Sequence, residues 1–133
     1  MQIIVFKLND EEFAVETSKV ESINDMMKVT HVPAAPDYIK GLINLRGNVI
    51  SLLDIELLLD VQKKNGEKNN IIILNVKDEL VGIAVESVSE VMEVKEDQLE
   101  NITDENNKAY VKAIVNLGSK IVTLIDIDEL QIN

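Results

Sequence analysis

Short runs of apolar residues recur along the chain, separated by glycine, asparagine, aspartate or charged residues. Some runs alternate apolar with polar positions and others are apolar throughout, as in half-buried and fully buried β-strands. Isoleucine, valine and leucine dominate the runs, which also favours sheet. The pattern predicts roughly nine or ten strands, as in a barrel or sandwich. The clearest runs are residues 3–8, 12–16, 40–45, 48–53, 70–76, 80–85, 89–94, 110–117 and 120–126.

Two places in this pattern indicate short helices. Ser18 and Glu21 have the spacing of a capping box, in which each side chain accepts a hydrogen bond from a free backbone amide, so we expect a helix over residues 18–26. A further helical turn is expected after Asp54, because aspartate is a favourable N-cap. The polar segment 62–70 is the predicted boundary between two subdomains of one domain spanning residues 1–133.

The chain also contains an internal repeat. Residues 38–59 align without gaps with residues 110–131 at an offset of 72, and eight of the 22 pairs are identical. Both copies place a glycine between two apolar runs, Gly47 in the first and Gly118 in the second, which suits the positive φ of a two-residue hairpin loop. Each copy predicts a strand, a tight turn, a strand and a short helix. Two similar small barrels that share an apolar seam would explain this repeat, and a groove is expected at the seam.

Composition narrows the class of partner. The chain has 24 acidic and 13 basic residues and a formal charge of -11, which disfavours binding to nucleic acid and to anionic membrane surfaces. The first residues show no signal peptide, and no apolar run approaches the roughly 20 residues of a membrane-spanning helix. Cysteine is absent, so disulfides and thiolate chemistry are excluded. A cytoplasmic protein without direct membrane insertion is the simplest interpretation.

The residues that carry catalysis or bind metals and phosphates are missing or isolated. His31 is the only histidine, and without cysteine it makes no usual zinc site unless carboxylates complete it. No nucleophile elbow and no glycine-rich phosphate loop is present. Residues 86–105 contain eight acids against one lysine, but they lack the spacing of a calcium loop. They predict a solvated acidic face, or one that steers a basic partner. We therefore predict no enzyme activity, no cofactor and no metal.

Residues 32–54, VPAAPDYIKGLINLRGNVISLLD, resemble the signature of the CheW family of bacterial chemotaxis adaptors. The shared features are two prolines, a strand ending in Asn-Leu-Arg-Gly and a strand ending in aspartate. The similarity extends over residues 6–23, 80–91 and 110–130. The resemblance implies an all-β fold of two pseudo-symmetric five-stranded SH3-like barrels that share a core. It also implies a non-enzymatic adaptor that couples a CheA-type histidine kinase, through its regulatory domain, to the cytoplasmic hairpin tips of chemoreceptors. Such a protein is expected to be a monomer alone and part of larger arrays.

Four residues are candidates for receptor binding, and each has a second interpretation. Arg46 is the only arginine, which suggests planar bidentate recognition, although it could instead pair with Asp54. The family resemblance associates this arginine with receptor coupling. Gly41 and Gly82 lie in predicted strands, where glycine usually marks close backbone packing. The resemblance puts them near the receptor-binding surface, and it assigns Val20, otherwise a core valine, to the receptor-facing groove.

Two other functions remain open from the sequence. One is a coupling protein of a non-flagellar pathway, and the other is a β-barrel that binds a small ligand or acts as an enzyme. The kinase contact is expected at the ends of barrel strands, because the kinase's regulatory domain is a homologue in the family that the chain resembles.

Overall fold

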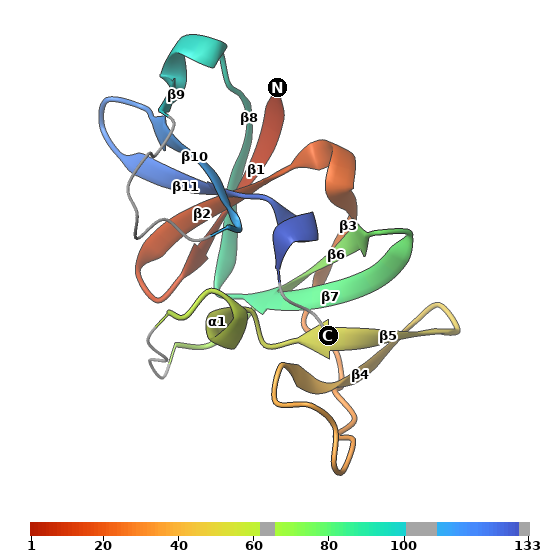
Figure 1. The fold of residues 1–133 in the computed structure, drawn as a ribbon. Coiled ribbons are helices and arrows are strands. Elements are labelled where there is room, and N and C mark those ends of the chain that lie inside the picture. Colours follow the sequence, from red (N-terminus) through yellow and green to blue (C-terminus); the bar gives the residue numbers. More distant parts are fainter. Residues whose placement is uncertain (62–65, 101–108, 131–133) are drawn as a thin grey trace.

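The computed structural model describes residues 1–61, 66–100 and 109–130, which form two β-sheets and four short helical turns (Figure 1). The strands in chain order are β1 (Gln2–Leu8), β2 (Glu11–Glu16), β3 (Val20–Asp25), β4 (Ile39–Leu45), β5 (Asn48–Leu53), β6 (Asn70–Val76), β7 (Glu79–Val85), β8 (Ser87–Glu93), β9 (Leu99–Glu100), β10 (Val111–Asn116) and β11 (Ile121–Ile125). The helical turns are η1 (Thr17–Lys19), α1 (Ile55–Leu58), η2 (Glu96–Gln98) and η3 (Ile127–Glu129). The predicted all-β fold with short helices is confirmed.

Each sheet curls into a small barrel. Sheet A has the strand order β8-β1-β2-β11-β10-β9, and sheet B has the order β3-β6-β7-β5-β4. Sheet B closes because Thr30, beyond the end of β3, pairs with Leu42 of β4 through two backbone hydrogen bonds of 2.8 Å. Sheet A closes in the equivalent way, because β9 continues the path of β8 beyond η2 and pairs with β10. We call the two units barrel A and barrel B.

The two halves of the chain exchange strands between the barrels. Barrel A combines β1 and β2 with β8–β11, whereas barrel B consists of β3–β7. In each barrel, a parallel strand pair joins the two halves of the chain: β2 with β11 in barrel A, and β5 with β7 in barrel B. The predicted subdomain boundary at 62–70 therefore needs correction, because this segment joins α1 to β6 within barrel B. It separates the two halves of the sequence but not the two barrels, and residues 62–65 lie outside the described residues.

Three apolar clusters hold the barrels together, and their arrangement explains the continuous apolar runs. Val5 of β1 packs inside barrel A, and Ile73 of β6 packs inside barrel B. Phe6 of β1 and Ile72 of β6 point to the opposite faces of their strands and form a third cluster between the barrels, which is the predicted shared seam. Strands that are covered on both faces need apolar residues at every position. Burial of each such side chain contributes about 1.5–3 kcal/mol.

The repeat predicted from the sequence is present in both barrels. Residues 39–58 form β4, a tight turn, β5 and α1, and residues 111–129 form β10, a turn, β11 and η3, while Gln131 lies outside the described residues. The turns differ, because Arg46 and Gly47 both have positive φ, 54° and 88°, whereas in the second copy only Gly118 does. The first is a type I′ hairpin and the second resembles type II′.

The helix predicted over residues 18–26 is wrong. Only Thr17–Lys19 form a 3-10 turn, without a side-chain cap, and Val20–Asp25 form β3 instead. A β-bulge between Val20 and Ser22 interrupts the alternation, so that Val20 and Ile23 face the same side of the strand. Their spacing of three residues therefore imitates that of a helix. The turn predicted after Asp54 is confirmed, because the Asp54 carboxylate accepts the Leu57 N–H at 3.2 Å.

Candidate protein-binding site

The four candidate residues all belong to barrel B, but only two of them can touch a partner. Gly41 lies on β4 and Gly82 on β7, and both are buried. Val20, at the start of β3, is half-buried, and Arg46, between β4 and β5, is exposed. The structure thus separates residues that shape the barrel from residues that reach its surface.

Gly41 permits the closure of barrel B. A Cβ at this position would lie 2.5 Å from the Thr30 carbonyl oxygen and 2.7 Å from the Val29 side chain. These atoms belong to the segment that pairs with Leu42 and completes the barrel. Any larger residue would therefore push the segment away. The packing interpretation of this glycine is supported.

Gly82 makes room for apolar side chains inside barrel B. A Cβ here would lie 3.3 Å from methyl groups of Ile43, Ile71 and Leu52. Those residues belong to the cluster that fills the barrel. Because the nearest atoms are the ends of side chains, an added methyl group would be partly accommodated. Gly82 acts on the surface only through the shape of the barrel wall.

Arg46 projects from the tip of the β4–β5 hairpin. Leu45 pairs with Asn48, so Arg46 and Gly47 form the whole loop, and the Asn44 side chain accepts the Gly47 N–H at 2.9 Å. Asp54 directly follows the last residue of β5, at the end of the strand opposite the hairpin tip. A rise of about 3.3 Å per residue puts Asp54 about 20 Å from Arg46. The alternative ion pair with Asp54 is therefore excluded. None of the ion pairs within the described ranges includes Arg46, so its guanidinium is available to a partner.

Val20 lies beside an exposed apolar neighbour that sequence reasoning missed. Val20 pairs with Leu74 of β6 and packs against the seam, and Ile23 pairs with Ile72 and is 40% exposed. The bulge brings both side chains to the seam-facing side of β3. Together they form a small apolar edge on this side of β3. Val91 of β8, which pairs with Ile4, is similarly exposed in barrel A, at 51%. Both residues lie outside the repeat of residues 38–59 and 110–131, so the repeat gave no signal for them.

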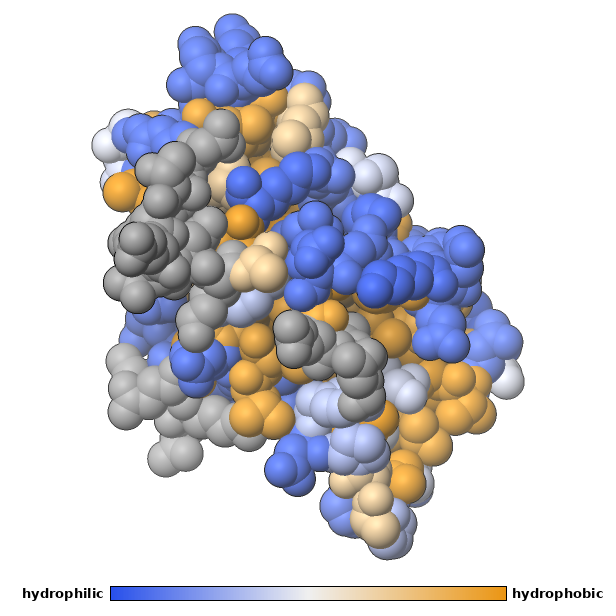
Figure 2. Space-filling model, in the orientation of Figure 1, coloured by the Kyte–Doolittle hydropathy of each residue, from blue (hydrophilic) through white to orange (hydrophobic). Residues whose placement is uncertain are grey.

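A second apolar pair lies where β5 and β7 diverge. Val49 is 66% exposed and Leu80 is 38% exposed, and both line a shallow hollow with Asn48, Ser51 and Glu79. In Figure 2, hydrophobic residues gather around the β4–β5 hairpin, below a band of hydrophilic residues that crosses the molecule. Large apolar side chains exposed next to one another are typical of protein contacts. The hollow lies at the N-terminal ends of β5 and β7.

The equivalent hollow of barrel A is charged instead. It is lined by Ile121, the repeat counterpart of Val49, but also by Lys120 and Glu12. The Lys120 ammonium lies 3.0 Å from Glu12 and 3.2 Å from Glu90. The pKa of Lys120 is raised mainly by its hydrogen bond to Glu12, and next by its hydrogen bond to Glu90. The two barrels therefore present different chemistry at matching positions.

The acidic stretch 86–105 is partly engaged within the molecule. The Glu86 carboxylate accepts the Asn9 N–H at 2.7 Å, and Glu93 pairs with the N-terminal amine at 2.9 Å. Glu90 pairs with Lys120 at 3.2 Å. Asp104 and Glu105 lie outside the described residues. The prediction of a uniformly solvated acidic face therefore needs correction in the described part of this stretch, because Glu86, Glu90 and Glu93 bond to other groups of the protein.

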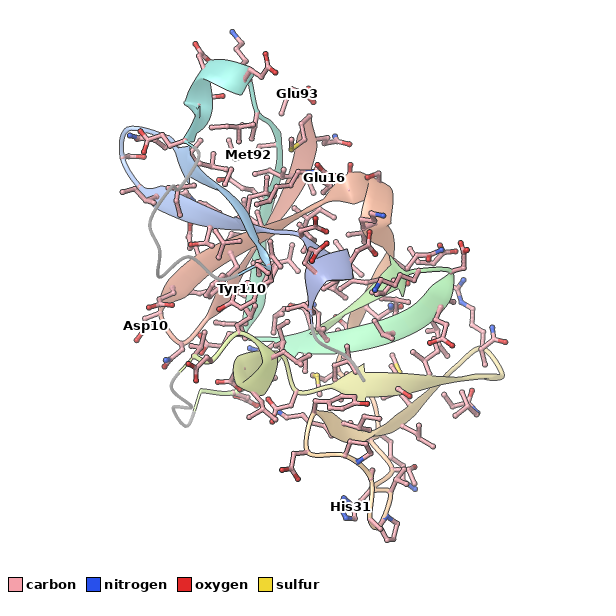
Figure 3. All side chains as sticks on the ribbon, in the orientation of Figure 1. Asp10, Glu16, His31, Met92, Glu93 and Tyr110 are labelled. Atoms are coloured by element: carbon pink, nitrogen blue, oxygen red, sulfur yellow. The ribbon has the colours of Figure 1, made fainter. Side chains whose placement is uncertain are left out.

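His31 lies exposed between β3 and β4, at the lower end of Figure 3, far from the labelled Glu16 and Tyr110. Among residues 1–61, 66–100 and 109–130, no three histidine or acidic side chains gather closely enough to hold a metal ion. No helix in these ranges is long and apolar enough to span a membrane.

The fold and its surface define a two-barrel module with exposed apolar positions suited to protein binding. A CheW-like domain model matches residues 2–132, so the chain belongs to the CheW-like domain family. It is 29% identical to the chemotaxis protein CheW of Klebsiella aerogenes, covering 97% of this chain and 80% of that protein. It is 30% identical to CheW of Bacillus subtilis, covering 94% and 83%. The crystal structure of the scaffolding protein TtCheW from Thermoanaerobacter tengcongensis superposes with a TM-score of 0.88 at 26% identity, covering 99% and 93%.

Proposed function

We propose that this chain is a non-enzymatic chemotaxis coupling protein that joins a CheA-type histidine kinase to the cytoplasmic hairpin tips of chemoreceptors. The observation that carries the proposal is the CheW-like match over residues 2–132. Coupling requires no bond making, because each partner needs only a complementary surface. One surface holds the regulatory domain of the kinase, and another holds the receptor. The protein works in the cytoplasm, as a monomer that enters larger arrays.

The proposed receptor surface consists of Val20, Ile23 and Arg46. Val20 and Ile23 supply apolar area beside the seam, and Arg46 supplies a charged group with five donors that suits a carboxylate on the receptor. Gly41 and Gly82 belong to this site indirectly, because they hold the strands that carry the contact residues. A receptor helix that laid an apolar stripe along β3 would bury both Val20 and Ile23.

The proposed kinase surface is the hollow between β5 and β7. Val49 and Leu80 would insert into a matching apolar surface at the end of a kinase barrel. Micromolar affinity corresponds to about -8 kcal/mol, which a few buried apolar residues can supply. Modest contacts of this size suit an adaptor that must release and rebind its partners.

The test uses three purified components: this chain, a cognate kinase and a soluble receptor hairpin fragment. We expect the chain to co-precipitate with each partner separately and to raise kinase autophosphorylation only when the receptor fragment is present. The chain alone is expected to show no phosphotransfer. Failure to bind the kinase, or phosphotransfer without it, would contradict the proposal.

A further inference from the structure

The polypeptide passes between the two barrels at two points within the described residues. The first is η1, which leads from β2 of barrel A to β3 of barrel B. The second is Glu86, which leads from β7 of barrel B to β8 of barrel A. In Figure 3 the labelled Glu16 marks the end of β2, just before the first crossing. The shared core packs the barrels against each other, and these crossings add the chain connections between them.

The second crossing is fixed mainly by the backbone. The Glu86 N–H donates to the Lys7 carbonyl oxygen at 3.0 Å, and its carbonyl accepts the Asn69 side-chain amide at 3.0 Å. The Glu86 carboxylate also accepts the Asn9 N–H. These bonds tie Glu86 to β1, to the β1–β2 turn and to the segment before β6. This crossing therefore has little freedom.

The first crossing is held to barrel A by side chains at both ends of η1. The Thr17 hydroxyl donates a hydrogen bond to Gln2 of β1, and an ion pair holds Lys19 at the end that enters β3. The Lys19 Nζ lies 2.7 Å from Asp128 Oδ2. Lys19 is the last residue before β3, and Asp128 lies in η3, directly after β11 of barrel A. Ile127 beside it is buried in the shared core, so η3 is firmly attached. The ion pair thus joins the start of the proposed receptor strand to barrel A, one residue before Val20.

The surroundings favour the charged form of both partners of this ion pair. The pKa of Asp128 is lowered, first by the hydrogen bond from Lys19 and further by the backbone amide and charge of Lys77. Lys77 lies in the β6–β7 turn of barrel B, so Asp128 is attracted by two segments of the opposite barrel. The pKa of Lys19 is raised, first by its hydrogen bond to Asp128, with small additions from Asp126 and Glu16.

We infer that the Lys19–Asp128 ion pair is a latch that sets the angle of β3 to barrel A. Through this angle, the effect of receptor binding at Val20 and Ile23 is transmitted to the kinase. An ion pair about a third exposed adds little to stability, so variants that break it should keep the fold. Lys19 and Asp128 are positioning residues and need not touch either partner. The functional part of this inference rests on the proposed function, whereas the geometric part does not.

The first experiment separates binding from activation. The variants are Lys19→Glu, Asp128→Lys and the double exchange, with Lys112→Met as the matched control. Lys112 pairs with Glu16 at 2.7 Å with similar exposure, but both residues belong to barrel A. We expect each single variant to keep its affinity for the separate partners, to lose about fivefold in receptor-dependent kinase activation, and to be rescued by the exchange. Full activation in both single variants, or no recovery in the exchange, would overturn the latch.

The second experiment needs no partner. The chain contains no cysteine, so spin labels can be attached specifically at Asn48→Cys in barrel B and Ile121→Cys in barrel A. We expect the label-to-label distance distribution to broaden in Lys19→Glu, to narrow again in the exchange, and to be unchanged in Lys112→Met. An unchanged distribution in Lys19→Glu would refute the latch. A broadened distribution with no binding to a kinase would keep the latch and refute the proposed function.

Discussion

Gly41 and Gly82 lie on either side of Leu52, each paired with it across three neighbouring strands. On the β4 side, the absence of a Cβ admits the segment that closes barrel B. On the β7 side, it admits the tip of Leu52 itself and two isoleucines. The two glycines therefore shape one wall of the barrel from the two strands that flank β5, and their replacement would change the proposed receptor surface without removing a proposed contact residue.

Gly41→Ala is expected to destabilise the protein more than Gly82→Ala. Gly41 is opposed by a backbone carbonyl at 2.5 Å, which cannot move without breaking the Thr30–Leu42 pairing. Gly82 is opposed only by flexible side-chain ends at 3.3 Å, so overpacking there costs about 1–3 kcal/mol. Urea unfolding of both variants tests the order. Equal stability of the two would contradict the assigned role of Gly41.

Arg46→Ala is expected to change stability by no more than about 1 kcal/mol, since the position is exposed. Arg46 has a positive φ, 54°, like the neighbouring Gly47. Alanine also carries a Cβ and experiences the same strain, so the turn is retained. Receptor binding or kinase activation is expected to weaken. Melting temperature and receptor pull-down on the same variant decide the matter, with Arg46→Lys as the control that keeps the charge.

Val49→Asp is expected to abolish kinase pull-down while leaving the fold intact, because the side chain is 66% exposed and flanks the apolar hollow. The matched control is Ile121→Asp, which alters the equivalent position of barrel A, where the hollow already contains an ion pair. We expect the control to bind the kinase normally. Loss of binding in both variants, or in neither, would exclude the hollow between β5 and β7 as the kinase surface.

Asp128 is expected to stabilise the protein only above acidic pH. Its pKa in the folded state lies below the ordinary value of 3.8, mainly because Lys19 donates a hydrogen bond to it. The stabilisation is therefore present above that ordinary value and is lost as the pH falls through the folded pKa. The difference in unfolding free energy between the wild type and Asp128→Asn should be largest at neutral pH and disappear in strong acid. Asp97→Asn, at an exposed turn, controls for the loss of one charge, and a difference independent of pH would contradict the ion pair.

The local elements were predictable because they depend on neighbours in the chain. The apolar runs gave most strands, Asp54 gave the helical turn, and the repeat gave the two copies of the hairpin unit. Gly47 and Gly118 correctly marked two-residue turns. The resemblance carried by residues 32–54 led to the family, although it did not distinguish residues that touch a partner from those that shape the barrel.

The tertiary structure decided the features that depend on distant partners. The capping-box pattern at Ser18 and Glu21 predicted a helix, but β3 pairs with β6 instead. A strand with a bulge puts Val20 and Ile23 on one face, as a helix would, so the apolar spacing did not distinguish the two structures. The exchange of strands between barrels could not be predicted from the sequence. The parallel pairs β2 with β11 and β5 with β7 join distant segments, and the apolar pattern of a strand does not specify its pairing partner. For the same reason only the folded chain brings Lys19 to Asp128, because backbone pairing over more than a hundred residues determines that distance.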